Sequence, residues 1–71
     1  MTRKMIVIDP KATQQVIDKL VNTPECMDSI RNQKCYDYEA RFGAFVRVKL
    51  GIILLSSIDW TKVAQAMEAA L

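Results

Sequence analysis

The chain has 71 residues, of which 51% are hydrophobic and 25% are charged, and its formal net charge is +2. This length predicts a single small domain, 1–71, whose core is marginal, so a second copy or another protein is expected to cover part of the apolar surface. The net charge is too small to imply a nucleic-acid ligand by itself.

Two cysteines, Cys26 and Cys35, and the absence of histidine bear on compartment and chemistry. Secreted proteins of this length usually carry more cysteines, so two reduced thiols are expected. A single disulfide between Cys26 and Cys35 is the alternative. The N-terminal sequence is too briefly apolar for a secretory signal, and the longest apolar run, 52–55, is far shorter than the roughly 20 residues that span a bilayer. We therefore expect a cytoplasmic protein that does not enter a membrane.

The first predicted element is a strand at residues 5–8, where four apolar side chains in succession suggest burial on both faces. Asp9 and the proline after it then start a helix over Pro10–Val21, because aspartate caps free amides and proline suits the first helical position. Residues 23–25, Thr-Pro-Glu, repeat this signal for a second, shorter helix that ends near Asn32. The residues expected to be buried are Ala12, Val16, Ile17, Leu20 and Val21 in the first helix, and Cys26, Met27 and Ile30 in the second.

Residues 36–56 alternate, with apolar residues at the even positions from 38 to 54 and every charged residue at an odd position. Strict alternation indicates a strand with one buried face. A long helix is the alternative, but it would scatter the charges around its circumference, and Gly43 and Gly51 would each cost about 1 kcal/mol relative to alanine. The pattern therefore favours two strands of a hairpin, joined by a loop at residues 42–44.

Asp59 predicts the start of the last helix, either as its N-terminal cap or as the partner of Ser56 in a capping box. The order of elements is then β-α-α-β-β-α. This order predicts an α+β fold, with a small antiparallel or mixed sheet and helices packed on one face; an all-α fold is the alternative. The inward face of the last helix holds Trp60, Val63, Ala64, Met67 and Leu71.

Candidate catalytic residues are few, because the chain has no histidine to act as a general base near neutral pH. Asp37 and Glu39 would face the same side of a strand, but ion pairs across the hairpin explain this pair of carboxylates more simply. Cys26 and Cys35 lack the further ligands of a zinc site, which leaves a thiol-based redox or metal protein as a distant alternative. We expect no enzyme, no cofactor and no metal site.

The second hairpin strand would end with apolar residues on both of its faces, because the outward positions continue from Lys49 to Ile53 and Leu55. Either another part of the chain covers the end of this strand, or the end is exposed and available to bind another protein. The sequence therefore predicts a non-enzymatic binding module, such as a small inhibitor, adaptor or regulator, which acts by protein–protein contact and forms a homodimer. The predicted protein-binding residues are Phe45, Arg47, Lys49, Ile53 and Leu55.

Nucleic acid is the alternative ligand. The outward face of the hairpin would combine basic side chains with an exposed phenylalanine, as in proteins that contact phosphates and stack a base of a single strand. Ion pairs with the acids on the same face would explain these charges without a ligand. The residues of this alternative site are Arg3, Lys4, Arg41, Phe45, Arg47 and Lys49.

Overall fold

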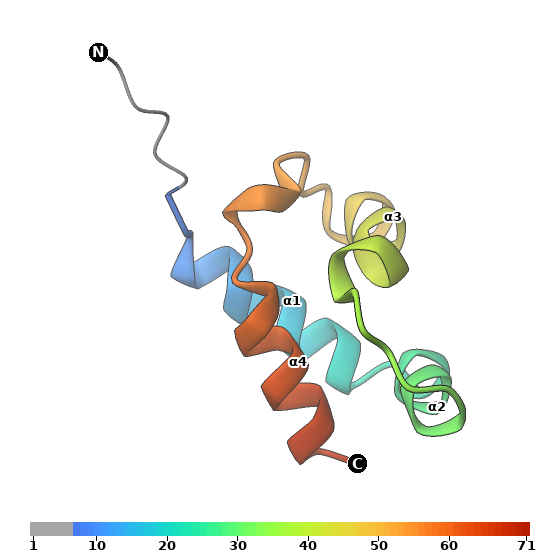
Figure 1. Cartoon of the computed structure of the whole chain (residues 1–71). Coiled ribbons are helices and arrows are strands. Elements are labelled where there is room, and N and C mark those ends of the chain that lie inside the picture. Colours follow the sequence, from blue (N-terminus) through green and yellow to red (C-terminus); the bar gives the residue numbers. More distant parts are fainter. Residues whose placement is uncertain (1–6) are drawn as a thin grey trace.

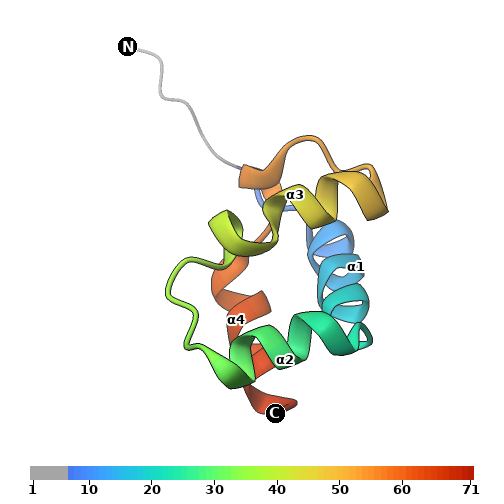
Figure 2. The ribbon, with the colours of Figure 1, turned by 90° about the vertical axis from the view of Figure 1, so that its right-hand side faces the viewer.

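The computed structural model describes residues 7–71, and these residues form helices and connecting loops without any strand. The α-helices are α1 (Pro10–Val21), α2 (Pro24–Asn32), α3 (Tyr38–Leu50) and α4 (Trp60–Ala69), with a short 3-10 helix, η1 (Leu55–Ser57), between the last two. The predicted α+β sheet fold is therefore wrong, and the all-α alternative describes residues 7–71. Helices α1 and α4 lie side by side, and α2 and α3 cross this pair in a second layer (Figures 1 and 2).

Helices α1 and α2 have the predicted starts and ends, and α4 begins after Asp59 as predicted but ends at Ala69. Side-chain caps explain the starts of α1 and α4, whereas the Thr23 side chain makes no capping hydrogen bond to α2. The Asp9 carboxylate accepts hydrogen bonds from the backbone N–H groups of Lys11 and Ala12, at 3.0 and 3.1 Å. The Asp59 carboxylate accepts from the N–H of Lys62 at 3.2 Å, so Asp59 itself is the cap of α4. These contacts satisfy amide groups that have no partner inside the helix.

The predicted hairpin over residues 36–56 is wrong, because most of this segment forms α3. Asp37 caps the helix by accepting a hydrogen bond from Ala40 N at 3.0 Å. Tyr38, Phe42 and Val46 are buried on one face, since even-numbered residues four apart also share one side of a helix. The chain leaves the helix at Gly51, whose φ of 66° lies in the left-handed region that glycine tolerates best.

The predicted strand at residues 5–8 falls partly outside the described residues, since the description begins at position 7. Val7 and Ile8 belong to no regular element and are exposed. The predicted burial on both faces is therefore wrong for these two residues. Asp9 N donates to the carbonyl oxygen of Ser57 at 2.8 Å, so the chain enters α1 beside the end of η1.

The hydrophobic core lies between the two helical layers. Val16 and Leu20 of α1 and Val63 and Met67 of α4 are fully buried, as predicted. Leu71 was also expected inside and is instead exposed, because α4 ends at Ala69. The other buried apolar residues are Cys26, Met27, Ile30, Cys35, Tyr38, Phe42, Val46 and Ile58.

The N-terminal ends of α1 and α4 are joined through Thr13, a buried polar residue. Its hydroxyl group donates to the carbonyl oxygen of Asp9 at 2.9 Å and accepts from Asp59 N at 3.1 Å. A buried hydroxyl without partners would destabilise the fold, and these two bonds remove that cost. Thr13 therefore connects positions 46 residues apart in the sequence.

Gly43, in the middle of α3, is explained by the residue that packs against it. A Cβ atom at position 43 would lie 2.8 Å from Cδ1 of Leu55, which is closer than van der Waals contact allows. The absence of a side chain therefore lets η1 approach α3 directly. Glycine lowers the stability of a helix, and the packing of the Leu55 side chain in this space offsets that loss.

We expect the effect of Gly43→Ala on stability to depend on the side chain at position 55. In the Leu55→Ala background, the substitution should stabilise the fold by about 1 kcal/mol, which is the difference in helix propensity. With Leu55 present, its methyl group must move to admit the new Cβ atom, so the gain should be smaller. Urea denaturation of the four proteins of this double-mutant cycle measures the coupling.

The matched control for this cycle is Leu54→Ala, because Leu54 is exposed and does not contact position 43. Gly43→Ala should have the same effect in the Leu54→Ala background as in the unmodified chain. An equal gain from Gly43→Ala in all three backgrounds would contradict the packing of η1 on α3.

Candidate functional site

Three large apolar side chains are exposed at the C-terminal end of α3 and in the loop that follows it. Val48 is 80% exposed, Ile53 82% and Leu54 65%, and we call these residues the apolar surface. The rise of a helix and the length of an extended chain place their Cα atoms within about 15 Å of one another. Several exposed apolar residues within one short segment are a candidate interaction site, whereas isolated ones need no explanation.

The loop that carries Ile53 and Leu54 is held at its far end by contacts of Leu55. The side chain of Leu55 lies against Gly43, and its carbonyl oxygen accepts a hydrogen bond from the Trp60 indole N–H at 2.8 Å. Ile52, on the other side, is partly buried against the core. Ile53 and Leu54 therefore lie between two residues that contact the rest of the fold and are themselves exposed.

Positive charge borders the apolar surface. Arg47 and Lys49 lie in the last turn of α3 and are exposed on either side of Val48 in the sequence. The sequence contains no acidic residue between Glu39 and Asp59. The segment that carries the apolar surface therefore has only basic ionisable side chains.

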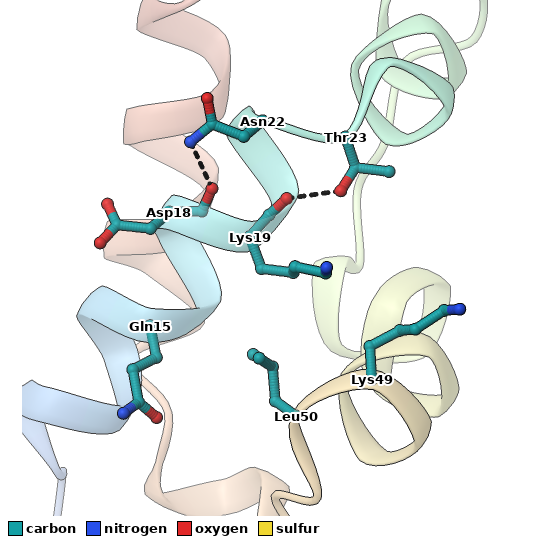
Figure 3. A pocket seen from close by; sticks show the side chains of 7 residues that line it. All are labelled: Gln15, Asp18, Lys19, Asn22, Thr23, Lys49 and Leu50. Carbon is teal, nitrogen blue, oxygen red and sulfur yellow. Dashed lines mark hydrogen bonds between the residues drawn. The ribbon is translucent and has the colours of Figure 1, made fainter.

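An open groove of about 570 Å³ separates the end of α1 from the end of α3. Lys19 on α1 and Lys49 on α3 stand on its two walls, with Leu50 between them (Figure 3). The one acidic residue of the groove, Asp18, accepts a hydrogen bond from the Gln14 side chain at 2.9 Å. The lining residues are Gln15, Asp18, Lys19, Asn22, Thr23, Lys49 and Leu50.

The predicted protein-binding residues do not all lie on this surface. Arg47, Lys49 and Ile53 are exposed there, but Phe45 and Leu55, expected on an outward face, are partly buried against the core. Sequence analysis missed two exposed residues, Val48 and Leu54, because the alternation placed them on an inward face. The signal that could have found Val48 is the spacing of Ala40, Ala44 and Val48, which share the side of α3 opposite Phe42.

The residues of the nucleic-acid alternative are dispersed, and two of them, Arg3 and Lys4, lie outside the described residues. The Arg41 guanidinium donates to the carbonyl oxygen of Gln33 at 2.9 Å and to the carbonyl and hydroxyl oxygens of Ser29 at 3.3 Å. It therefore connects α3 to α2. Phe45 is partly buried, which leaves Arg47 and Lys49 as the exposed pair of this set.

The cysteines belong to the core. Cys26 and Cys35 are both buried and unpaired, and burial, with a smaller effect of the Glu25 charge, raises the pKa of the Cys26 thiol. A raised pKa disfavours the thiolate, which is the reactive form. Within residues 7–71, no group of three or more His, Cys, Asp or Glu side chains is placed to hold a metal ion.

Tyr38 forms a polar contact between α3 and α4, because its hydroxyl group donates to Glu68 Oε2 at 2.9 Å. Burial raises the pKa of Tyr38 to about 12, and the hydrogen bond to Glu68 and the charge of that carboxylate contribute in the same direction. The phenol therefore stays protonated near neutral pH. We interpret this pair as a structural link between the helices.

No known family model, curated protein or solved structure matches this chain, so the candidate site depends on its own geometry alone. Among the helices of residues 7–71, none combines the length and the apolar character needed to span a bilayer.

The Tyr36→Phe variant retains Tyr38 as its one tyrosine, and its tyrosinate absorbance should appear with a midpoint of about pH 12. Because the ordinary tyrosine pKa is about 10, the unfolded chain ionises first. Ionisation of Tyr38 should leave the free energy of unfolding unchanged below about pH 10 and should lower it as the pH rises toward 12.

The control for this titration is a second substitution, Glu68→Gln, in the Tyr36→Phe chain. Removal of the carboxylate should lower the midpoint, because the Glu68 charge opposes ionisation of the phenol. Circular dichroism at each pH confirms that the chain is still folded. A midpoint near pH 10 in the folded Tyr36→Phe protein would contradict the buried contact.

Proposed function

We propose that this protein is a non-enzymatic binding module, such as a small inhibitor, adaptor or regulator, which acts by protein–protein contact. The contact surface in this proposal is the apolar surface of Val48, Ile53 and Leu54, bordered by Arg47 and Lys49. One observation carries the proposal: these three large apolar side chains are mostly exposed within residues 48–54.

The burial of these side chains against a partner would be favourable because apolar area leaves water, at about 25 cal/mol per Å². Binding normally also costs conformational entropy when loops and side chains become ordered. Here the contacts of Leu55 already hold one end of the loop that carries Ile53 and Leu54. A preorganised loop lowers that cost, which supports the choice of this surface as the binding site.

A protein partner is better supported than nucleic acid. Phosphate binding needs several basic side chains on one surface, and base stacking needs an exposed aromatic ring. Arg41 is engaged with α2, and Phe45 is partly buried. The exposed apolar side chains at and after the end of α3, Val48, Ile53 and Leu54, are aliphatic rather than aromatic, which suits an apolar protein contact better than base stacking.

The homodimer predicted from the sequence stays a prediction, as does the cytoplasmic location. Sedimentation at high micromolar concentration tests the dimer prediction. A homodimer should have about twice the 8.1 kDa mass of one chain.

The test of the proposal is quantitative capture of partners from an extract of the native cell by the immobilised chain. Ile53→Asp should reduce the captured partner at least tenfold, because it places an unpaired charge at the centre of an apolar contact. Arg47→Gln should have a milder effect, about twofold to fivefold, because exposed ion pairs contribute little. Quantitative mass spectrometry compares the variants with the unmodified chain.

The matched control is Tyr36→Asp, because Tyr36 is 86% exposed and lies in the loop before α3, at the other end of that helix. This variant should capture the partner as well as the unmodified chain does. Equal capture by the Ile53→Asp variant, or an equal loss with Tyr36→Asp, would show that the apolar surface is not the binding site.

A further inference from the structure

We infer that Met5 and Ile6, in the N-terminal segment that precedes the described residues, contact Leu54 and Ile53 in the free protein and compete there with the partner. This inference rests on the proposed function and adds the regulation of that site. Its evidence is the place where the described chain begins, together with the exposed apolar side chains beside that place.

The described chain begins beside the loop that carries Ile53 and Leu54. Asp9 N donates to the carbonyl oxygen of Ser57 at 2.8 Å, and Ser57 N donates to the carbonyl oxygen of Leu54 at 3.1 Å. With standard backbone dimensions, these two bonds place the Ile8 carbonyl carbon within about 11 Å of the Leu54 carbonyl oxygen. The described residues before α1 accordingly lie near η1 in both views (Figures 1 and 2).

The chain before Asp9 is long enough to reach this loop, and its apolar residues come at a suitable distance. Residues 5–8 are Met-Ile-Val-Ile. An extended chain covers about 10 Å from Ile8 back to Met5. Met5 and Ile6 therefore reach the loop, while Val7 and Ile8 span the distance and remain exposed.

The contact is favourable for both of its sides. Ile53 and Leu54 are mostly exposed, and apolar side chains that cover them remove apolar area from water. Because Asp9 joins the segment to the fold, the effective concentration of Met5 and Ile6 at the loop is high, which favours even a weak contact.

Other surfaces near the chain start suit these side chains less well. A small pocket of about 110 Å³ borders Ile8, but most of the residues that line it are polar. Its polar residues are Thr13, Gln14, Asp59 and Lys62. Leu71 is exposed but follows α4, whose 10 residues carry the chain about 15 Å away from Asp59.

Charge limits how far along the apolar surface the segment extends. The two residues before Met5 are basic, and so are the two neighbours of Val48 in the sequence. Like charges repel each other, so the segment should stop at Ile53 and leave Val48 exposed to the partner.

The test is NMR spectroscopy of the full chain with 13C-labelled methyl groups of isoleucine, leucine, valine and methionine. We expect nuclear Overhauser effects between a methyl group of Met5 or Ile6 and one of Ile53 or Leu54. The double variant Met5→Ser with Ile6→Ser should shift the methyl signals of Ile53 and Leu54, because it removes their neighbours.

The matched control is Arg3→Ser with Lys4→Ser, which changes the same segment without removing an apolar side chain and should preserve the Overhauser effects. Leu54→Ser should shift the methyl signals of Met5 and Ile6, whereas Val48→Ser should leave them in place. A mixture of labelled and unlabelled chains should show no such effects between chains, since the contact is within one chain.

Competition with the partner is tested by the capture assay. If the segment covers half to nine-tenths of the molecules, its removal raises the apparent affinity about twofold to tenfold. The Met5→Ser with Ile6→Ser variant should therefore capture more partner than the unmodified chain by up to this factor, and the Arg3→Ser with Lys4→Ser variant should not.

The inference is overturned by the absence of these Overhauser effects, by their occurrence between chains, or by methyl signals of Ile53 and Leu54 that do not respond to the Met5→Ser and Ile6→Ser changes. Equal or reduced capture by that double variant would also overturn it. In each of these cases, capture that still depends on Ile53 leaves the proposed function intact. Loss of that dependence would instead count against the proposed function.

Discussion

The contact of Leu55 with Gly43 is the constraint on which the candidate site depends. Because Gly43 has no side chain, η1 lies directly against α3, and the Trp60 indole holds the Leu55 carbonyl in the same place. The chain between Gly51 and Leu55 therefore runs back along α3, from its C-terminal end toward its middle (Figure 2). Ile53 and Leu54 lie in this loop and are exposed to solvent, as is Val48 on the last turn of the helix.

The helix boundaries that the sequence predicts correctly are those with a local cause. Asp9 and Asp59 bind backbone N–H groups within three residues of themselves, so the residues that start α1 and α4 are visible without tertiary information. The apolar spacing that follows each start identifies the buried face, as Val16 and Met67 show. Such signals do not depend on which helix packs against which.

The segment from 36 to 56 could not be assigned in the same way. Apolar residues at every second position also include residues four apart, which share one side of a helix, so the pattern fits both a strand and a helix. Its even-numbered apolar residues divide between two sides of α3, with Phe42 buried and Ala44 exposed. Gly43 argues against a helix until Leu55 is known to fill its space, and that contact is tertiary. The exposed positions of Arg47, Lys49 and Ile53 agree with the sequence-based set, although the predicted sheet face does not exist in residues 7–71.

The most direct test of this account is an NMR measurement on the full chain, which combines 13Cα secondary shifts with nuclear Overhauser effects. The account predicts helical shifts throughout Tyr38–Leu50, an interruption at Gly51 and a cross-peak between a Leu55 methyl group and the Gly43 Hα. Strand shifts in this segment would contradict it, together with cross-peaks between Glu39 and Arg47, which would face each other across a hairpin with its loop at residues 42–44. The apolar surface would then have to be redefined on the two faces of a hairpin.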